Sequence, residues 1–186
     1  MRIRRASADD LDAMLALSNW YAEHTAANFA VEPESEQDWQ RAFEASHEHY
    51  PWLIAEDDDH DVFGFAKASP YAGRCAYRWS AEITVYLRDG LTGRGVGTAL
   101  YDMLFAVLRA QGFRTVTAGI TLPNDASVAL HRRYGLEQIG VRSRIGWKFD
   151  RWHDVSLWQG KISDDEGPPT PIRPVADVWP SIHAPR

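Results

Sequence analysis

Apolar residues in the first half of the chain are spaced first for helices and then for strands. After Ser7, a residue type that favours helix N-caps, apolar side chains recur every three or four residues as far as Tyr21. A second helix is predicted over residues 36–47, and the acidic run 57–61 is typical of a solvated hairpin turn. The strands predicted in this half are residues 1–5, 52–56, 62–68 and 79–87.

The second half alternates helices and strands after a glycine-rich segment. Residues 91–97 lead into a long amphipathic helix whose end is indicated by Gly112. The remaining elements are a strand over 115–121, a helix over 125–134, and strands over 138–148 and 155–162. This order predicts an α/β (α+β layered) fold, in which a mixed central β-sheet is flanked by helices. Its strand–loop–helix–strand unit is a crossover of the kind that places an anion at a helix N-terminus.

The chain divides into one predicted domain and a tail. A length of 186 residues fits one domain with a substantial core, and we assign residues 1–162 to it. Residues 163–186 are rich in proline, so we expect them to be extended or disordered, with Trp179 as a candidate anchor to the domain.

Composition narrows the classes of partner. The formal net charge of −6 argues against a nucleic-acid-binding protein, which normally carries a basic stripe. The single cysteine, Cys75, excludes an internal disulfide and a zinc site built from cysteines. The N-terminus lacks the apolar segment of a signal peptide, and no run of about 18 apolar residues occurs. We therefore expect a cytoplasmic protein with no membrane partner.

Glycines 93, 95 and 97 alternate at the start of the long helix. Without Cβ atoms they let backbone N–H groups approach an anion, and Arg94 adds a positive charge beside them. A tight strand–helix connection without a ligand explains the same pattern. The segment lacks the Lys-Ser/Thr ending of a nucleotide P-loop and does not match the full dinucleotide fingerprint.

The segment from Val85 to Leu100 resembles the acetyl-CoA pyrophosphate motif of the GNAT acetyltransferases, although Thr92 stands where that family expects Gln or Arg. Further motifs resemble one subfamily, the phosphinothricin and methionine sulfone/sulfoximine N-acetyltransferases. They are NFAVEP (28–33), YRWSAEITVY (77–86), LPNDASVALH (122–131) and WHDVSLWQ (152–159). The matches run in order from about residue 2 to residue 162.

The resemblance implies a GNAT fold, with acetyl-CoA as co-substrate and no metal. Its implied contacts are Val85, Tyr86, Leu87, Gly93, Arg94, Gly95, Val96, Gly97, Thr98 and Asn124. Asn124 suits a helix N-cap equally well, because Asp125 starts a predicted helix.

Acetyl transfer to nitrogen needs a neutral amine, and therefore a general base. Glu82 is our candidate, since it lies in a mostly apolar strand where burial would raise its pKa. A surface position, or an ion pair with Arg78, is the structural alternative. The subfamily also implies a catalytic role for His131, where a purely structural histidine is the alternative. A backbone N–H near Val85 is the candidate donor to the developing oxyanion.

Six residues are predicted to surround the acceptor amine. They are Phe29, Arg74, Arg78, Trp79, Lys148 and Trp152. Arginine presents a planar fork that suits carboxylate or phosphinate oxygens, while aromatic rings would form walls around a short side chain. Core packing of the tryptophans and solvated loop charges for the arginines are the alternatives.

The sequence thus predicts an N-acetyltransferase that uses acetyl-CoA to acetylate the primary amine of a small amino-acid-like substrate. Relatives suggest a homodimer. Two alternatives stay open: an acetyltransferase for another amine, such as an aminoglycoside, polyamine or protein N-terminus, and a non-catalytic acetyl-CoA-binding module.

Overall fold

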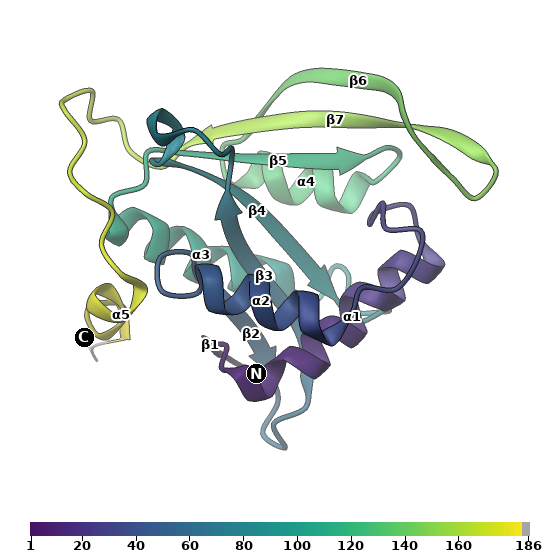
Figure 1. Ribbon diagram of the computed structural model, residues 1–186, viewed down its shortest axis with the longest axis horizontal. Coiled ribbons are helices and arrows are strands. Elements are labelled where there is room, and N and C mark those ends of the chain that lie inside the picture. The colour runs from purple at the N-terminus through teal and green to yellow at the C-terminus, as the bar shows by residue number, and fades with distance from the viewer. Residues whose placement is uncertain (184–186) are drawn as a thin grey trace.

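The computed structural model describes residues 1–183 and contains one seven-stranded mixed sheet with helices on both faces (Figure 1). The strand order is β1-β2-β3-β4-β5-β7-β6. The strands are β1 (Arg2–Arg5), β2 (Trp52–Glu56), β3 (Val62–Pro70), β4 (Ser80–Leu87), β5 (Thr115–Thr121), β6 (Glu137–Lys148) and β7 (Arg151–Lys161). The helices are α1 (Leu11–His24), α2 (Glu36–Ser46), α3 (Val96–Gln111), α4 (Asp125–Arg133) and α5 (Val175–His183), with 3-10 turns η1 (Ala8–Asp10) and η2 (Cys75–Tyr77). The predicted α/β layer arrangement is confirmed.

Strand β2 shows how the two layers arise from one sequence pattern. All five of its residues are buried, because helices cover both faces of the sheet. Leu53 and Ala55 lie in the core that α3 covers, while Trp52 and Ile54 pack with residues of α1 and α2. Successive strand residues point to opposite faces, so one short apolar run supplies both cores.

The sheet opens between β4 and β5, which are the only parallel neighbours among the strands of residues 1–183. Their register covers only residues 80–82 of β4 against 115–117 of β5. Beyond Glu82, β4 stays paired with β3 alone, and beyond Thr117, β5 stays paired with β7 alone. The two strands diverge in Figure 1, and the crossover between them is made by α3. This parting creates the space in which a ligand can enter the sheet.

The predicted elements are largely confirmed, with two corrections. Strand β7 begins at Arg151, earlier than the expected residue 155, because it pairs with β6 as far as the hairpin tip at Lys148. The expectation of an extended or disordered tail is wrong for Val175–His183, which form helix α5. The last three residues of the predicted tail, 184–186, lie outside the described residues.

Helix α5 is held by apolar contacts that span a long sequence separation. Val175 and Val178, one helical turn apart, are buried against Val107 of α3, and Trp179 packs beside them. The segment leading to α5 is also tied down, since the Trp79 indole N–H donates to the Thr170 carbonyl at 2.7 Å. The tail therefore packs onto the sheet-and-helix body, with Trp179 at the contact, as expected for its anchor.

Candidate active site

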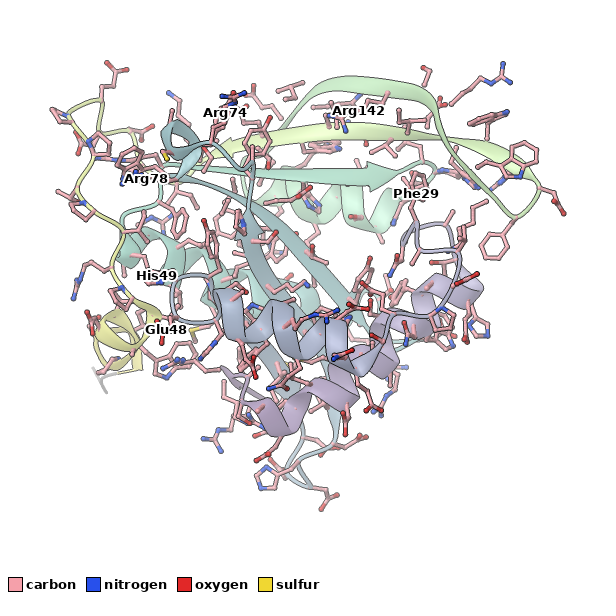
Figure 2. The ribbon with its side chains drawn as sticks, in the orientation of Figure 1. Phe29, Glu48, His49, Arg74, Arg78 and Arg142 are labelled. Atoms are coloured by element: carbon pink, nitrogen blue, oxygen red, sulfur yellow. The ribbon has the colours of Figure 1, made fainter. Side chains whose placement is uncertain are left out.

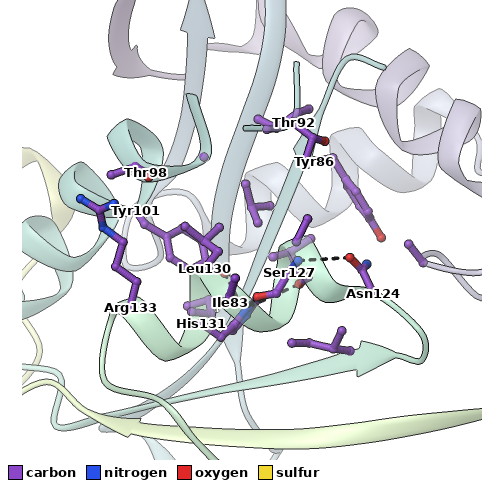
Figure 3. A pocket seen from close by; sticks show the side chains of 18 of the residues that line it. Ile83, Tyr86, Thr92, Thr98, Tyr101, Asn124, Ser127, Leu130, His131 and Arg133 are labelled. Carbon is purple, nitrogen blue, oxygen red and sulfur yellow. Dashed lines mark hydrogen bonds between the residues drawn. The ribbon is translucent and has the colours of Figure 1, made fainter. Parts of the chain in front are cut away.

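A cavity of about 680 Å³ occupies the opening between β4 and β5 (Figure 3). Its walls are residues 82–87 of β4, the glycine-rich segment with the first turns of α3, the end of β5, and α4. Ten predicted residues line it: Glu82, Val85, Tyr86, Leu87, Gly93, Gly95, Gly97, Thr98, Asn124 and His131. The fold thus gathers most of the predicted cofactor and catalytic residues around one space.

The glycine-rich segment forms an open cradle at the start of α3. Gly93 and Gly95 have φ of 80° and 84°, a backbone conformation that favours glycine, and nothing lies within 4 Å of a Cβ built on either. The first helical bond runs from the Ala99 N–H to the Gly95 carbonyl, 3.0 Å, so the preceding amides have no partner within the helix. No side chain of residues 1–183 caps this end. The free amides and the helix dipole suit a diphosphate.

The two other residues predicted in this segment lie outside the cavity wall. Val96 is buried in the core that α3 covers, and Arg94 is exposed. Arg133, which the sequence analysis did not single out, lines the cavity, and in Figure 3 its side chain extends from α4 in the direction of Thr98. Arg132 and Arg133 both lie in the last turn of α4, where basic residues are common for reasons of helix stability. The sequence therefore gave no signal that Arg133 faces a ligand.

Strand β4 offers unpaired peptide groups to the same space. The Arg88 N–H donates to the Phe63 carbonyl on β3, 2.7 Å. Because peptide groups alternate between the two edges of a strand, those of Ile83, Val85 and Leu87 face away from β3 and toward the opening. The Leu87 carbonyl accepts a bond from the Tyr21 hydroxyl at 2.8 Å. Val85 therefore keeps both an amide donor and a carbonyl acceptor free for an extended ligand, since β5 has already diverged.

Glu82 lies at the point where the two strands part. It lines the cavity, but its side chain is exposed, so the predicted burial is wrong. Burial was expected because apolar residues flank it in sequence; divergence of β5 leaves this position open instead. The alternative ion pair with Arg78 is not among the salt bridges of residues 1–183. The carboxylate is thus accessible to a ligand.

His131 is only 3% exposed and lines the cavity from α4. Its Nδ1 lies 2.7 Å from the Ser127 carbonyl oxygen, and its Nε2 lies 3.0 Å from the Tyr101 hydroxyl. Burial lowers the pKa of the imidazole below its ordinary value, against the opposing effect of the Ser127 hydrogen bond. The ring is therefore neutral at pH 7, and both of its nitrogens are engaged in hydrogen bonds.

Asn124 begins α4 as its N-cap, because its side-chain oxygen accepts a bond from the Ser127 N–H at 3.1 Å. It also lines the cavity, where Figure 3 shows its side chain beside the bonded Ser127. The N-cap interpretation is confirmed, and contact with a ligand stays a prediction.

None of the six predicted acceptor residues lines this cavity. Arg74 and Arg78 are exposed around η2 and lie far across the molecule from Phe29 (Figure 2). Arg78 is partly engaged, with its Nε 3.1 Å from the Cys75 carbonyl and its guanidinium 5.3 Å from the centre of the Trp79 ring. Trp79 is in turn held by the tail through Thr170.

The other three acceptor candidates gather near the tip of the β6–β7 hairpin. The Phe29 ring packs on Gly146 and lies 6.1 Å from the His153 ring, whereas Trp152 is 48% exposed. Lys148 is buried, and its ammonium donates to the carbonyls of Ala22 and Asn28. These two bonds use two of its three N–H donors, and contact of Lys148 with an acceptor stays a prediction. Lys148 thus joins the hairpin to the last turn of α1 and to the loop that follows it.

The site combines features that suit a phosphate-bearing acyl donor. Residues 1–183 contain no group of three His, Cys, Asp or Glu side chains able to hold a metal ion, and no helix among them is long and apolar enough to cross a membrane. Free amides at the glycine-lined helix start suit a diphosphate, the open strand edge suits an extended arm, and the carboxylate and neutral imidazole suit proton transfer. These are the features that the resemblance implies for an acyltransferase using a coenzyme A thioester.

Comparison with known proteins agrees with this class. Residues 14–136 match the Acetyltransferase (GNAT) family. The chain is 40% identical over 178 residues to the phosphinothricin N-acetyltransferase of Streptomyces viridochromogenes, and the alignment covers 96% of each chain. It is 34% identical over 168 residues to the L-methionine sulfoximine/L-methionine sulfone acetyltransferase of Pseudomonas paraeruginosa, over 90% of this chain and 98% of the relative.

Solved structures give the same result. A GNAT superfamily phosphinothricin acetyltransferase from Sinorhizobium meliloti, solved in complex with AcCoA, superposes with a TM-score of 0.86 at 32% identity, over 91% of this chain and 92% of the other. The chain belongs to the GNAT family and is an acetyl-CoA-dependent N-acetyltransferase. The predicted family, fold and enzyme class are confirmed.

Proposed function

We propose that this enzyme acetylates the primary amine of a small amino-acid-like substrate of the phosphinothricin, methionine sulfone or methionine sulfoximine type. The observation that carries the proposal is the cavity where β4 and β5 part, because it joins the glycine cradle to Glu82 and His131. The named activities of the relatives support the substrate class.

Residues of this chain hold the donor in three places. The amides at the start of α3 bind the diphosphate, with Arg133 and Arg94 adding positive charge. The free peptide groups of Val85 pair with the pantetheine arm in the manner of a neighbouring strand. Asn124 contacts the same arm from the start of α4. When bound, acetyl-CoA supplies the acetyl group as a reactive thioester.

The amine reacts only when neutral, so a proton must leave it first. Glu82 accepts that proton, directly or through water, because its exposed carboxylate faces the cavity at the parting of the strands. The Val85 N–H is placed to donate to the acyl oxygen as negative charge develops on it. His131 is the second proton-transfer group, since its ring is buried, neutral and beside the same space.

Arg74 and Arg78 are proposed to bind the acid group of the acceptor. Both are exposed, and a carboxylate or phosphinate would draw Arg78 away from its bond to the Cys75 carbonyl. The double replacement Arg74→Ala/Arg78→Ala should raise KM for an amino-acid substrate with kcat little changed. An unchanged KM would refute this pair as the clamp, and the replacement of exposed Arg151 by Ala is a matched control.

A homodimer through the outer hairpin completes the proposal. Strand β6 is an edge of the sheet, and its Ile139, Val141, Ile145 and Trp147 are 44–60% exposed. Such a row on an open edge favours a second copy that covers it. Sedimentation of the wild type as a dimer, and of Val141→Glu as a monomer, is expected. A wild-type monomer at micromolar concentration would refute the dimer.

A thiol-release assay with acetyl-CoA tests the substrate class. Methionine sulfone, methionine sulfoximine and phosphinothricin should be acetylated faster than spermidine, kanamycin and a peptide N-terminus. Preference for one of the latter three would replace the proposed acceptor and keep the donor. Calorimetry with coenzyme A tests the donor separately, and absence of heat at millimolar ligand would refute the cavity as its site.

A further inference from the structure

A buried hydroxyl meets the candidate catalytic imidazole at the base of the cavity. Tyr101 comes from the second turn of α3, its side chain is fully buried, and its hydroxyl lies 3.0 Å from the His131 Nε2. Both side chains line the cavity, and their rings meet edge to face with centres 5.5 Å apart. Figure 3 shows Tyr101 on α3 and His131 on α4, the two helices that contribute to this side of the cavity.

The hydrogen-bond partners determine which nitrogen of His131 carries its proton. A carbonyl oxygen can only accept, so the 2.7 Å contact with the Ser127 carbonyl requires a proton on Nδ1. In a neutral imidazole Nε2 then holds a lone pair, and the Tyr101 hydroxyl must donate to it. The two contacts together specify a single neutral tautomer and a single ring orientation.

The partner residue is itself held rigidly by its surroundings. The Tyr101 ring packs edge to face on Tyr134, with centres 5.3 Å apart. The Tyr134 hydroxyl donates to the Thr98 carbonyl at 2.8 Å and lies 2.6 Å from an Asp102 carboxylate oxygen. Thr98 belongs to the first turn of α3, beside the glycine cradle. The orientation of the imidazole is thus tied to the helix start that forms the donor site.

We propose that Tyr101 is a positioning residue for acetyl transfer: with the Ser127 carbonyl it holds the His131 ring in one orientation and in the neutral Nδ1–H tautomer, so that Nε2 takes up a proton only when the Tyr101 hydroxyl stops donating to it. This inference rests on the proposed function, because it assigns the arrangement to the reaction at the same cavity. Tyr101 acts through His131 and contacts neither substrate in this scheme.

Kinetics of Tyr101→Phe provide the first test. The change removes one hydroxyl from an aromatic ring that keeps its packing, so kcat should fall about tenfold through loss of one hydrogen bond. KM for acetyl-CoA and for the amine should stay within about twofold, because neither site loses a contact. Tyr50→Phe, which removes a part-buried hydroxyl beside Phe113, is the matched control and should leave both constants unchanged.

A double replacement separates positioning from an independent effect. If Tyr101 acts through His131, Tyr101→Phe should slow the His131→Gln enzyme little or not at all. A further tenfold loss in that background would overturn the inference. So would a Tyr101→Phe enzyme that is stably folded and has the kcat of the wild type.

Nitrogen-15 spectra of the wild type test the tautomer without any variant that must fold. The His131 ring, assigned by its absence from His131→Gln, should show a protonated Nδ1 and an unprotonated, hydrogen-bonded Nε2. A protonated Nε2 at neutral pH would overturn the inference. Wild-type enzyme that acetylates none of the amines refutes the proposed function and the catalytic meaning of Tyr101 with it, whereas normal turnover with the wrong tautomer refutes Tyr101 alone.

Discussion

Two polar clusters of this protein contain similar residues but differ in function: one stabilises the fold, and the other is open to a ligand. At the β1–β2 edge, the Arg4 guanidinium donates to both carboxylate oxygens of Asp10 at 2.7 Å and to Glu56 at 2.9 Å. Asp10 also accepts from the backbone and hydroxyl of Ser7. At the parting of β4 and β5, by contrast, Glu82 is exposed and the amides at the start of α3 have no partner within the helix.

The two clusters differ in how many of their polar groups form hydrogen bonds or ion pairs with other members of the same cluster. Burial raises the pKa of Asp10, but the bonds from Arg4 and Ser7 outweigh it and bring the pKa below its ordinary value. Glu56 is fully buried beside them; its Oε2 accepts from Arg4, whereas its Oε1 has no hydrogen-bond partner among residues 1–183 and lies 3.4 Å from His60 Nδ1 and 3.8 Å from Arg2. A cluster whose charges are mostly paired with one another stabilises the fold, whereas one that keeps donors and acceptors open to solvent can bind and react.

The largest expected effect is on catalysis. Glu82→Gln should lower kcat by about 10²–10⁴-fold, because it removes the base without removing side-chain volume. The melting temperature should hardly change, since the side chain is exposed. Glu137→Gln, at an exposed strand position outside the cavity, is the control. Wild-type turnover in Glu82→Gln would remove Glu82 from the role.

The cluster at the β1–β2 edge should respond in the opposite way. Glu56→Ala leaves Arg4 without one of its two carboxylate partners, at a cost of about 3 kcal/mol in the free energy of unfolding. Folded enzyme should keep its kcat. Denaturant unfolding measures the loss, and Asp61→Ala, which breaks the exposed ion pair with Arg88, should change the midpoint far less. Equal midpoints for the two variants would contradict the comparison.

Two glycines with positive φ at opposite ends of α3 sharpen the distinction. Gly95→Ala and Gly112→Ala should each cost about 1–2 kcal/mol of stability, because φ of 84° and 99° strain any residue with a Cβ. Only Gly95→Ala should also weaken binding of coenzyme A, measured by calorimetry at a temperature where both are folded. Equal affinities in the two variants would show that the cradle does not contact the donor.

The smallest effect is the pH dependence of stability that arises from His131. Its pKa is lower in the folded chain than the ordinary 6.5, chiefly through burial, so the unfolded chain binds the proton more tightly. The stability that this neutral ring contributes is complete above pH 6.5 and is lost as the pH falls below it. His131→Gln should flatten this slope in denaturant unfolding, while His24→Gln, at an exposed position, should not. An unchanged slope in His131→Gln would contradict the assignment.

Local patterns predicted most of the elements and several cavity residues. The glycine cradle could be found because alternating glycines before an amphipathic helix are a local signal. The β5 bounds and the end of α3 at Gly112 follow from apolar periodicity and a glycine stop. Glu82 was chosen from its apolar strand context and the resemblance together, and His131 from the resemblance; both line the cavity.

Other features depend on partners distant in the chain. Val175 and Val178 alone do not make a helix, and their burial needs Val107 of α3. From the sequence alone Lys148 would be expected at the surface, but in the folded chain its ammonium donates to the carbonyls of Ala22 and Asn28.

By itself the sequence determined the periodicity of the helices and strands, the glycine loop, and the family to which the chain belongs. Only the tertiary structure decided that Glu82 is exposed, that α5 packs on α3, and that Tyr101 meets His131. The physical reason is that periodicity shows which face of a helix or strand is apolar. Exposure and hydrogen bonding depend instead on which residues, distant in the sequence, pack against that face. A tyrosine within an apolar helical stripe carries no mark of the imidazole that lies 30 residues further on.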